Sequence, residues 1–494
     1  MSSPAQGDQV QRLGGAKKLT IVDAAAQSVG FMGPVFSIAF LVPLLIGLTS
    51  ASGKGAGVAA PLSVILAAIG VLGIGWIVAE YARRIHAAGA LYDYVTDGLG
   101  PRFGAASGYL YYIGVTVLGA GLLVMIGGTI HDTLAGEWKF TAIPEVGWDV
   151  ILLIIVALVM LAGVSVSTKA QFALAVFSVT VVFIFFVYVI IKAGSHNDVA
   201  KALNPSSAPG GISGVFFGML YGVLLFTGFE TAANLGEETE NPKRDIPRAV
   251  LAAVLIVSVF YVVGSYAQVA GFHFDLAALG KNAGGPLFAL AGPAPFPGYG
   301  ANWLRQLVEI VVIFDMLAVL LGISVASSRG FFAMARDGRM PKAMGKVSGR
   351  GTPLVSGMVV LAFFAIVIIL TMTTKAFALQ GVPEYVSMFS WGSTFGGFAL
   401  VCIYLMLGIG AVRGLRDHNK KWAVYLAVLV TVVTTGSAIF GSIYKVPAPN
   451  NYAWMAAFAI FALGLIASFV FKEKAPVTST FDGLRDDEQG PVKI

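Results

Sequence analysis

Apolar runs of about twenty residues recur along the whole chain, and this feature constrains its fold more than any other. A bilayer core about 30 Å thick is crossed by a helix of roughly 20 apolar residues. Transmembrane β-strands would instead give ~10-residue stretches of alternating polarity, which are not seen. Hydrophobic residues make up 57% of the 494, and charged residues only 12%, about half the usual share in a soluble domain. The chain is therefore predicted to be an all-α polytopic membrane protein.

Twelve such segments can be counted, and each is predicted to cross the membrane as a helix. They lie at approximately 22–48, 60–82, 103–130, 148–166, 170–193, 212–235, 247–272, 303–328, 353–374, 383–407, 422–443 and 452–471. The polar residues on either side, 1–20 and 472–494, are expected to form short tails, which leaves about 21–471 as one twelve-helix body. An even number of crossings places both tails on the same side of the membrane.

Basic residues indicate which side that is. About three quarters of the 32 Lys and Arg residues lie in the tails or in loops on the same side as the tails. Because cytoplasmic loops carry an excess of Lys and Arg, both termini are predicted to be cytoplasmic in a multi-pass protein of the cell (inner) membrane. The net charge of +6 is then an orientation signal and a contact with the lipid bilayer, and no nucleic-acid partner is expected.

Two of the segments carry residues that interrupt a helix. The first contains Gly30, Gly33 and Pro34 near its middle, and the sixth contains Gly228 shortly before Glu230. Proline removes a backbone donor and clashes with the preceding turn. The two segments are equivalent if segments 1–5 and 6–10 are inverted repeats, and transporters with such repeats bind substrate at paired helix breaks. Two halves of six helices would fit the count equally well.

Three stretches resemble the amino acid–polyamine–organocation transporter superfamily, in particular its bacterial amino acid permeases. They are GFETAANLGEETENPKRDIPRAV (228–250), AEYARRIHAAGALYDYVTDGLGPRFG (79–104) and ASSRGFFAMARDGRMP (326–341). They occur in the family's order, and the resemblance covers roughly 20–470. It implies the leucine-transporter-type fold, with one five-helix repeat over about 21–193, its inverted copy over about 212–407, and two extra helices over about 422–471.

The resemblance also implies where the substrate binds. In this family, backbone amides at the break of the first span hold the substrate's carboxylate and carbonyls of both breaks hold its amine, which suits the free N–H and C=O groups of half-helix ends. Carried over to this chain, the substrate site consists of Gly30, Phe31, Gly33, Pro34, Val35, Gly114, Phe226, Thr227, Gly228, Phe229 and Ser324. The family's usual Gly-Ser-Gly is Gly33-Pro34-Val35 here. Because proline cannot donate, either other amides serve or the ligand differs.

Two carboxylates within the apolar segments are candidates for proton coupling. A charged carboxylate at the centre of a membrane helix costs ~2.5–3.5 kcal/mol on insertion scales. Glu230 adjoins the break of the sixth segment, and Asp315 lies about 21 Å along its helix from Arg329, slightly outside the membrane midplane. The alternative for both is a structural carboxylate that bonds to a neighbouring helix. Several proton-coupled relatives carry a lysine in the fifth span, and Ser178 takes its place here.

The predicted function is secondary active transport of an amino acid or related small amine by alternating access, with uptake coupled to a proton. Exchange of amino acids or amines, and sodium coupling through hydroxyls such as those of Ser178 and Ser324, are alternatives. A substrate sensor or a channel is a rival from another class, and tails of only about twenty residues disfavour the sensor. There is no Walker A or HExxH motif, and the five histidines lack metal-ligand spacing. No enzyme activity, cofactor or metal site is therefore expected.

Overall fold

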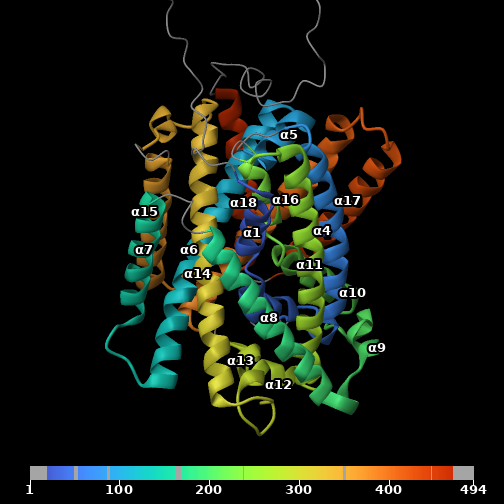
Figure 1. Ribbon diagram of the computed structural model, residues 1–494, viewed down its shortest axis with the longest axis vertical. Coiled ribbons are helices and arrows are strands. Elements are labelled where there is room, and N and C mark those ends of the chain that lie inside the picture. The colour runs from blue at the N-terminus through green and yellow to red at the C-terminus, as the bar shows by residue number, and fades with distance from the viewer. Residues whose placement is uncertain are drawn as a thin grey trace, which may run out of the picture.

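The computed structural model describes residues 19–48, 54–85, 89–162, 168–236, 239–348, 352–379, 381–444, 446 and 448–470. Both predicted tails, apart from Leu19 and Thr20, lie outside these ranges. Within them the chain is helical, with isolated β-bridges and no sheet (Figure 1). The prediction of an all-α protein is confirmed.

Long helices account for most of the described chain. They are α1 (Ile21–Met32), α4 (Ala60–Ala82), α6 (Pro101–Trp138), α7 (Glu145–Ala162), α8 (Thr168–Ala193), α10 (Ile212–Leu224), α11 (Pro242–Gly271), α14 (Asn302–Arg336), α15 (Leu354–Thr373), α16 (Glu384–Gly414), α17 (Lys421–Ile443) and α18 (Asn451–Val470). Eleven stretches of the described residues are long and apolar enough to cross a membrane, and α7 lies at the predicted fourth segment. A polytopic helical membrane protein is thereby confirmed, while the count of twelve and the inverted repeat stay predictions.

Short helices mark the two ends of the bundle. One end holds α5 (Leu91–Leu99), and α18 finishes there (Figure 1). The opposite end holds α9 (Val199–Ala202), α12 (Leu276–Lys281) and α13 (Pro286–Ala291). We refer to these as the α5 end and the α13 end. Since α6 starts beside α5 and is 38 residues long, it runs from the α5 end to the α13 end.

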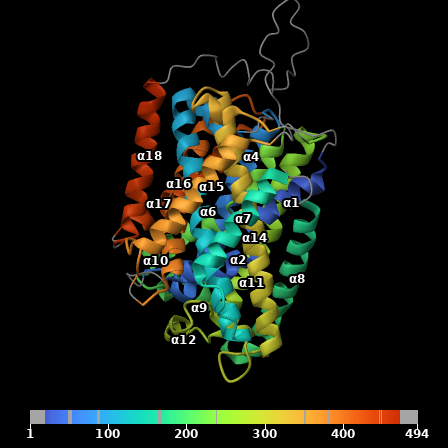
Figure 2. The ribbon, with the colours of Figure 1, turned by 90° about the vertical axis from the view of Figure 1, so that its left-hand side faces the viewer.

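The two interrupted stretches occupy the centre of the bundle. We call Ile21–Ile46 the first broken span and Ile212–Leu235 the second. Within the most apolar stretch of each, 94% of the residues are buried in the first and 83% in the second. The corresponding fraction is 33% for α15 and α17, and 17% for α18, which stands at the edge in Figure 2. The outer helices therefore separate the centre from lipid.

Small residues bring α6 and α16 into backbone contact. A methyl group on Gly396 of α16 would lie 3.0 Å from the side chain of Leu118 and 3.1 Å from the carbonyl of Gly114, both on α6. Gly121 and Gly392 approach each other further along the same interface. Such spacing of small residues is typical of close packing between membrane helices. Gly114, placed at the substrate site by resemblance, lies in this helix contact.

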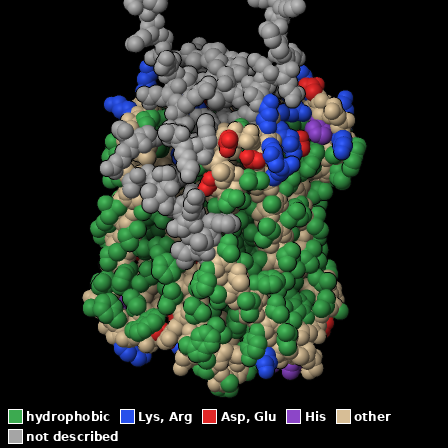
Figure 3. Space-filling view, viewed as in Figure 1, with side chains coloured by type: hydrophobic (Ala, Val, Ile, Leu, Met, Phe, Trp, Pro, Cys, Tyr) green, Lys and Arg blue, Asp and Glu red, His purple; other side chains and the backbone are tan. Residues whose placement is uncertain are grey.

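The outside of the bundle is apolar across its middle. Exposed large hydrophobic side chains come from several helices and include Ile154, Leu158, Ile256, Leu429 and Ile466. In Figure 3, hydrophobic side chains cover the middle of the face shown, and Lys and Arg side chains lie toward its ends. A belt of this kind suits the hydrocarbon interior of a bilayer.

Candidate functional site

The first broken span is interrupted at Gly33. There α1 ends, Gly33 adopts a left-handed φ of +51°, and α2 (Pro34–Phe36) begins the next helical stretch, which continues through a π-helical turn into α3 (Val42–Ile46). A side chain at Gly33 would also place its Cβ 2.1 Å from Cγ2 of Val319 on α14. Only glycine satisfies both conditions, so the interruption predicted here is present.

The interruption leaves backbone groups without their helical partners. Because Pro34 has no N–H, the carbonyl of Gly30 lacks the donor that an intact helix would supply four residues on. The amides of Val35 and Phe36 turn away from α1 and donate to Oδ2 of Asp315 on α14, at 2.9 and 2.8 Å. The break therefore presents free carbonyls on one side and amide donors on the other.

Asp315 occupies the position that the family resemblance assigns to the substrate's carboxylate. Its side chain is buried, at 4% exposure, and a single oxygen accepts both amides. Free N–H groups at the start of a helix favour an anion, and hydrogen bonds to a charged acceptor are about twice as strong as neutral ones. The donors at this break are thus Val35 and Phe36, and the chain itself supplies their acceptor.

The second broken span turns at Gly228. A 3-10 segment, η6 (Phe229–Leu235), follows Gly228, whose φ is +109°. A Cβ at Gly228 would lie 2.1 Å from the ring of Phe31 on α1. The hydroxyl of Ser28, also on α1, donates to the carbonyl of Phe229 at 2.8 Å. The two breaks are therefore in direct contact, as the pairing of broken helices predicts.

A small apolar cavity lies between the breaks. Its volume is about 20 Å³, enough for a single water molecule. The hydroxyl of Thr227 is buried and has no hydrogen-bond partner among the described residues. The lining residues are Phe31, Met32, Phe36, Ser37, Leu41, Leu118, Leu122, Leu224, Thr227, Val319 and Ile323. An amino acid needs far more space than this cavity offers.

The predicted site residues divide between the cavity wall and its supports. Phe31 and Thr227 line the cavity. Phe226 packs edge-on against Tyr261 of α11, with ring centroids 5.0 Å apart. The hydroxyl of Ser324 donates to a carbonyl of its own helix at 2.7 Å. The breaks thus bring together the residues of both spans, while Ser324 makes a contact within α14.

Sequence reasoning missed several wall residues. Leu118 and Leu122 of α6, Ile323 of α14 and Ser37 of the first broken span all line the cavity. The two leucines are four residues apart and so share one face of α6. A helix that is apolar all round does not reveal which face meets the site, which explains the omission.

Glu230 joins three helices beside the cavity. Its Oε1 accepts from the hydroxyl of Tyr111 on α6 at 2.9 Å. Its Oε2 accepts from the hydroxyl of Tyr404 on α16 at 3.0 Å and from the amide of Gly228 at 3.1 Å. Glu230 is only 1% exposed. Its partner Tyr111 belongs to the half of α6 that starts beside α5, which places this contact toward the α5 end. Sequence reasoning missed both tyrosines. Tyr111 and Tyr404 are separated from Glu230 by 119 and 174 positions in the sequence, and no local pattern links residues so far apart.

A larger cavity of about 670 Å³ opens at the α13 end. Its lining reaches Phe40 of the first broken span and Met125 of α6. The ring of Phe40 lies 6.2 Å from that of Phe36, which lines the small cavity. Phe36 in turn packs edge-on against Phe389 of α16 at 5.7 Å. Neighbouring aromatic rings therefore lie on the walls of the two cavities.

Paired helix breaks at the centre of an apolar bundle, with half-helix ends that face a common site, define the class of secondary transporters with broken helices. A comparison with protein-family models matches residues 29–446 to the family described as Amino acid permease. The chain therefore belongs to the amino acid permease family, within the amino acid–polyamine–organocation superfamily.

Individual proteins are similar over most of the chain. A branched-chain amino acid permease of Lactococcus lactis subsp. cremoris is 27% identical over 425 residues, which cover 82% of this chain and 84% of that one. A lysine-specific permease of the same organism is 25% identical over 420 residues, which cover 80% and 79%. A solved manganese transporter of Eremococcus coleocola superposes with a TM-score of 0.54 at 14% identity, over 91% of this chain and 93% of that one. The last is a likeness of fold alone. The two sequence relatives are permeases, not enzymes.

Proposed function

We propose that this permease takes up an amino acid, or a closely related amine, together with a proton, by alternating access. Membership of the family supports the substrate. The proton rests on one observation, the bonds from the amides of Val35 and Phe36 to Asp315. The bias of Lys and Arg toward one side of the membrane supports an orientation with the α5 end in the cytoplasm. In that orientation the larger cavity faces the outside.

The carboxylate of an amino acid competes with Asp315 for the same donors. Pro34 supplies no N–H, which leaves the amides of Val35 and Phe36 as the donors at the start of the second half-helix. Both already bond to one oxygen of Asp315. A substrate carboxylate can therefore be held at this end only if Asp315 withdraws.

Withdrawal of Asp315 supplies the reason for a proton. The side chain is buried, and a charged carboxylate without donors in such surroundings is far more costly than a neutral one. We expect Asp315 to take up a proton when the substrate's carboxylate replaces it. After the substrate has left toward the cytoplasm, Asp315 releases the proton and returns to the amides. One substrate and one proton then move together.

The substrate's ammonium group has acceptors on the other side of the break. The carbonyl of Gly30 lacks a helical donor because a proline follows four residues on, and that of Phe31 lacks one because Val35 donates to Asp315. The hydroxyl of Thr227 is also without a partner among the described residues. Carbonyls at the end of a half-helix favour a cation. A zwitterion fits between the two half-helix ends once the walls of the small cavity separate.

Glu230 is the other candidate for the proton, and its surroundings favour a different role. The donors to Glu230 include Tyr111, Tyr404 and Gly228. None of these is a donor of the first break, where we propose that the substrate's carboxylate binds. In the proposed orientation these contacts lie on the cytoplasmic side of the small cavity. We infer that Glu230 holds this side closed until substrate and proton are bound.

Binding and uptake by the purified protein test the proposal. Thermal unfolding is measured in detergent with each of the twenty common amino acids and with the corresponding amines and carboxylates. We expect one or more zwitterions to raise Tm, and the amine or carboxylate alone to raise it less. Uptake of such an amino acid into liposomes should follow an imposed proton gradient and not a sodium gradient. Stabilisation by amines alone would contradict coupling through Asp315, because an amine brings no carboxylate to replace that side chain at the amides of Val35 and Phe36. Uptake driven only by sodium would contradict the proton.

A further inference from the structure

The larger cavity contains charged groups that the central site does not use. It opens at the α13 end and has a volume of about 670 Å³, within the range of small-molecule sites. Its charged lining residues are Asp132, Glu137, Lys281, Arg305 and Glu309. Three carboxylates thus face two cationic side chains, and the cavity favours a ligand with a positively charged group.

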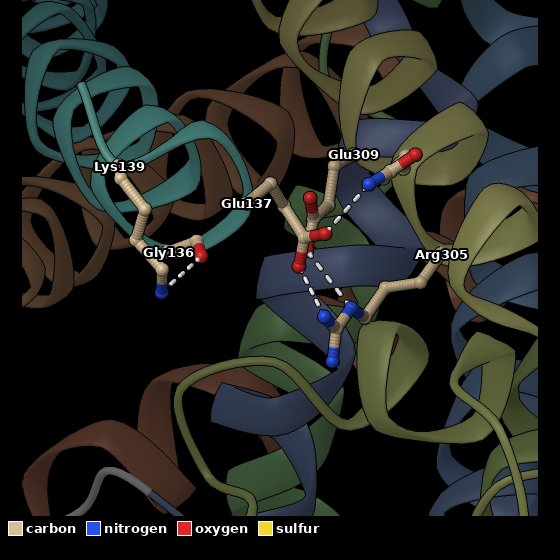
Figure 4. Close-up of polar contacts among 6 residues, drawn as sticks. Gly136, Glu137, Lys139, Arg305 and Glu309 are labelled. Carbon is tan, nitrogen blue, oxygen red and sulfur yellow. Dashed lines mark hydrogen bonds and ion pairs between the residues drawn. The ribbon is translucent and has the colours of Figure 1, made fainter.

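Two of these carboxylates lie beside the same arginine. The guanidinium of Arg305 on α14 donates to Glu137 at the end of α6, which also accepts from the side-chain amide of Gln306 at 2.8 Å. One turn further along α14, Oε1 of Glu309 lies 3.9 Å from Nε of Arg305, too far for a hydrogen bond. Figure 4 shows both carboxylates beside the same guanidinium. Because Arg305 bonds to Glu137, Glu309 is only partly neutralised.

Glu309 is a buried carboxylate with an oxygen that has no donor. The residue is 8% exposed, and its Oε2 has no hydrogen-bond partner among the described residues. It nevertheless lines the cavity, whereas the neighbouring Asp132 accepts from the hydroxyl of Tyr385. Buried polar atoms without a partner are rare, and each needs an explanation. An ammonium group in the cavity would satisfy this one with a charge-assisted bond.

We propose that this cavity is an outer binding site for a free amino acid, whose ammonium group donates to Oε2 of Glu309. The guanidinium of Arg305, with its side chain 35% exposed, lies beside it for the substrate's carboxylate. This inference rests on the proposed function, because it describes a site that the same substrate occupies before it reaches the central one. Phe40 lines the outer site, and its neighbour Phe36 lines the small cavity. The outer site and the central one are therefore lined by neighbouring aromatic rings.

The number of bound molecules tests for the outer site. Purified full-length protein is titrated at equilibrium with each of the twenty common amino acids in radiolabelled form, L-leucine and L-lysine first. For the amino acid that binds, we expect two molecules per protein. Glu309→Gln keeps the shape of the side chain and removes its charge, so it should weaken the outer site at least tenfold and leave the other unchanged. For L-leucine, 3-methylbutylamine should compete at the outer site, and 4-methylpentanoate, which lacks the ammonium group, should not.

A matched control separates this effect from a general loss of charge. Glu384→Gln removes a carboxylate that is exposed at the same end but does not line the cavity. The protein with this substitution should still bind two molecules. If Glu309→Gln fails to fold, Glu309→Asp keeps the charge one methylene further back and should weaken the outer site without abolishing it. A single molecule bound to the wild type, or two bound to Glu309→Gln with unchanged affinities, overturns the outer site and leaves the proposed function intact. If none of the twenty common amino acids binds the wild type, the proposed function fails too.

Discussion

At the scale of single residues, Gly33 determines the geometry of the proposed carboxylate site. Its φ of +51° and its contact with Val319 exclude a side chain. The turn that it makes is what directs the amides of Val35 and Phe36 away from α1 and toward Asp315. A change at Gly33 therefore acts on both the stability and the chemistry of the site.

Gly33→Ala should lower Tm and abolish uptake. A residue with a Cβ in the left-handed region costs about 1–2 kcal/mol, and the overlap with Val319 adds to it. Adding Val319→Ala removes the overlap but not the backbone strain, so it should restore only part of Tm. Gly436→Ala serves as the control because nothing lies within 4 Å of a Cβ there. Wild-type Tm and uptake in Gly33→Ala would show that the turn is not required.

The bond between Glu230 and Tyr404 predicts energetic coupling between them. In a double-mutant cycle of Glu230→Gln and Tyr404→Phe, the effects on the free energy of unfolding should depart from additivity by about 1 kcal/mol or more. Thr180→Ala, whose hydroxyl bonds within its own helix, provides the control when combined with Tyr404→Phe. That pair should be additive within about 0.5 kcal/mol. Additivity in both cycles would remove Glu230 as a link between the helices.

At the scale of elements, polar contacts connect the two broken spans to each other and to α11 and α14. Ser28 bonds across the breaks, and Tyr261 of α11 donates to the carbonyl of Leu225 at 2.7 Å, where the second broken span begins to turn. Such contacts replace the helical bonds that the breaks remove, which a membrane interior requires. The broken spans are thus held by long-range partners rather than by their own ladders.

Tyr261→Phe should cost about 1–3 kcal/mol in the free energy of unfolding. The change leaves the carbonyl of Leu225 buried without its donor, and an unsatisfied buried acceptor carries its full desolvation penalty. Tyr266→Phe, on the same helix, removes a hydroxyl that bonds to Asn197 in a partly exposed position and should cost less. Thermal unfolding of both variants provides the comparison. Equal losses of stability in the two variants would indicate that the bond to the broken span contributes no more than a partly exposed one.

These elements also show which features of the site could be predicted from the sequence. The breaks at Gly33 and Gly228 could be predicted because glycine and proline act on the backbone locally. The partner of the first break could not, since Asp315 lies 280 positions from Val35. Likewise, Glu230 stood out as a carboxylate in an apolar segment, but its two tyrosines did not. Local rules identify where a helix ends, and only the fold identifies what meets that end.

At the scale of the whole molecule, the two ends of the bundle differ. The α13 end contains the 670 Å³ cavity, whereas hydrogen bonds from Tyr111 and Tyr404 hold Glu230 on the other side of the small cavity, where we propose that they close the route toward the α5 end. The apolar belt and the class of fold follow from the composition of the segments. The small volume of the cavity between the breaks does not, because it depends on how side chains from separate helices pack.

Cysteine labelling tests the proposed orientation. Cys402 is the one cysteine of the chain, so Cys402→Ser gives a background free of thiols. In that background we expect Lys281→Cys, exposed at the α13 end, to react with an impermeant maleimide on intact cells. Arg416→Cys, whose position follows α16 at the α5 end, should react only after permeabilisation. The reverse pattern would invert the orientation.

The coupling of Asp315 to the substrate is the central claim, and Asp315→Asn tests it most directly. Asparagine still offers an oxygen to the amides of Val35 and Phe36 but cannot carry the proton. In liposomes, we predict that the variant exchanges internal for external substrate at a rate comparable to the wild type. It should no longer accumulate substrate when a proton gradient is imposed, whereas Glu230→Gln, if folded, should still do so. Proton-driven accumulation by Asp315→Asn at the wild-type level would contradict the account.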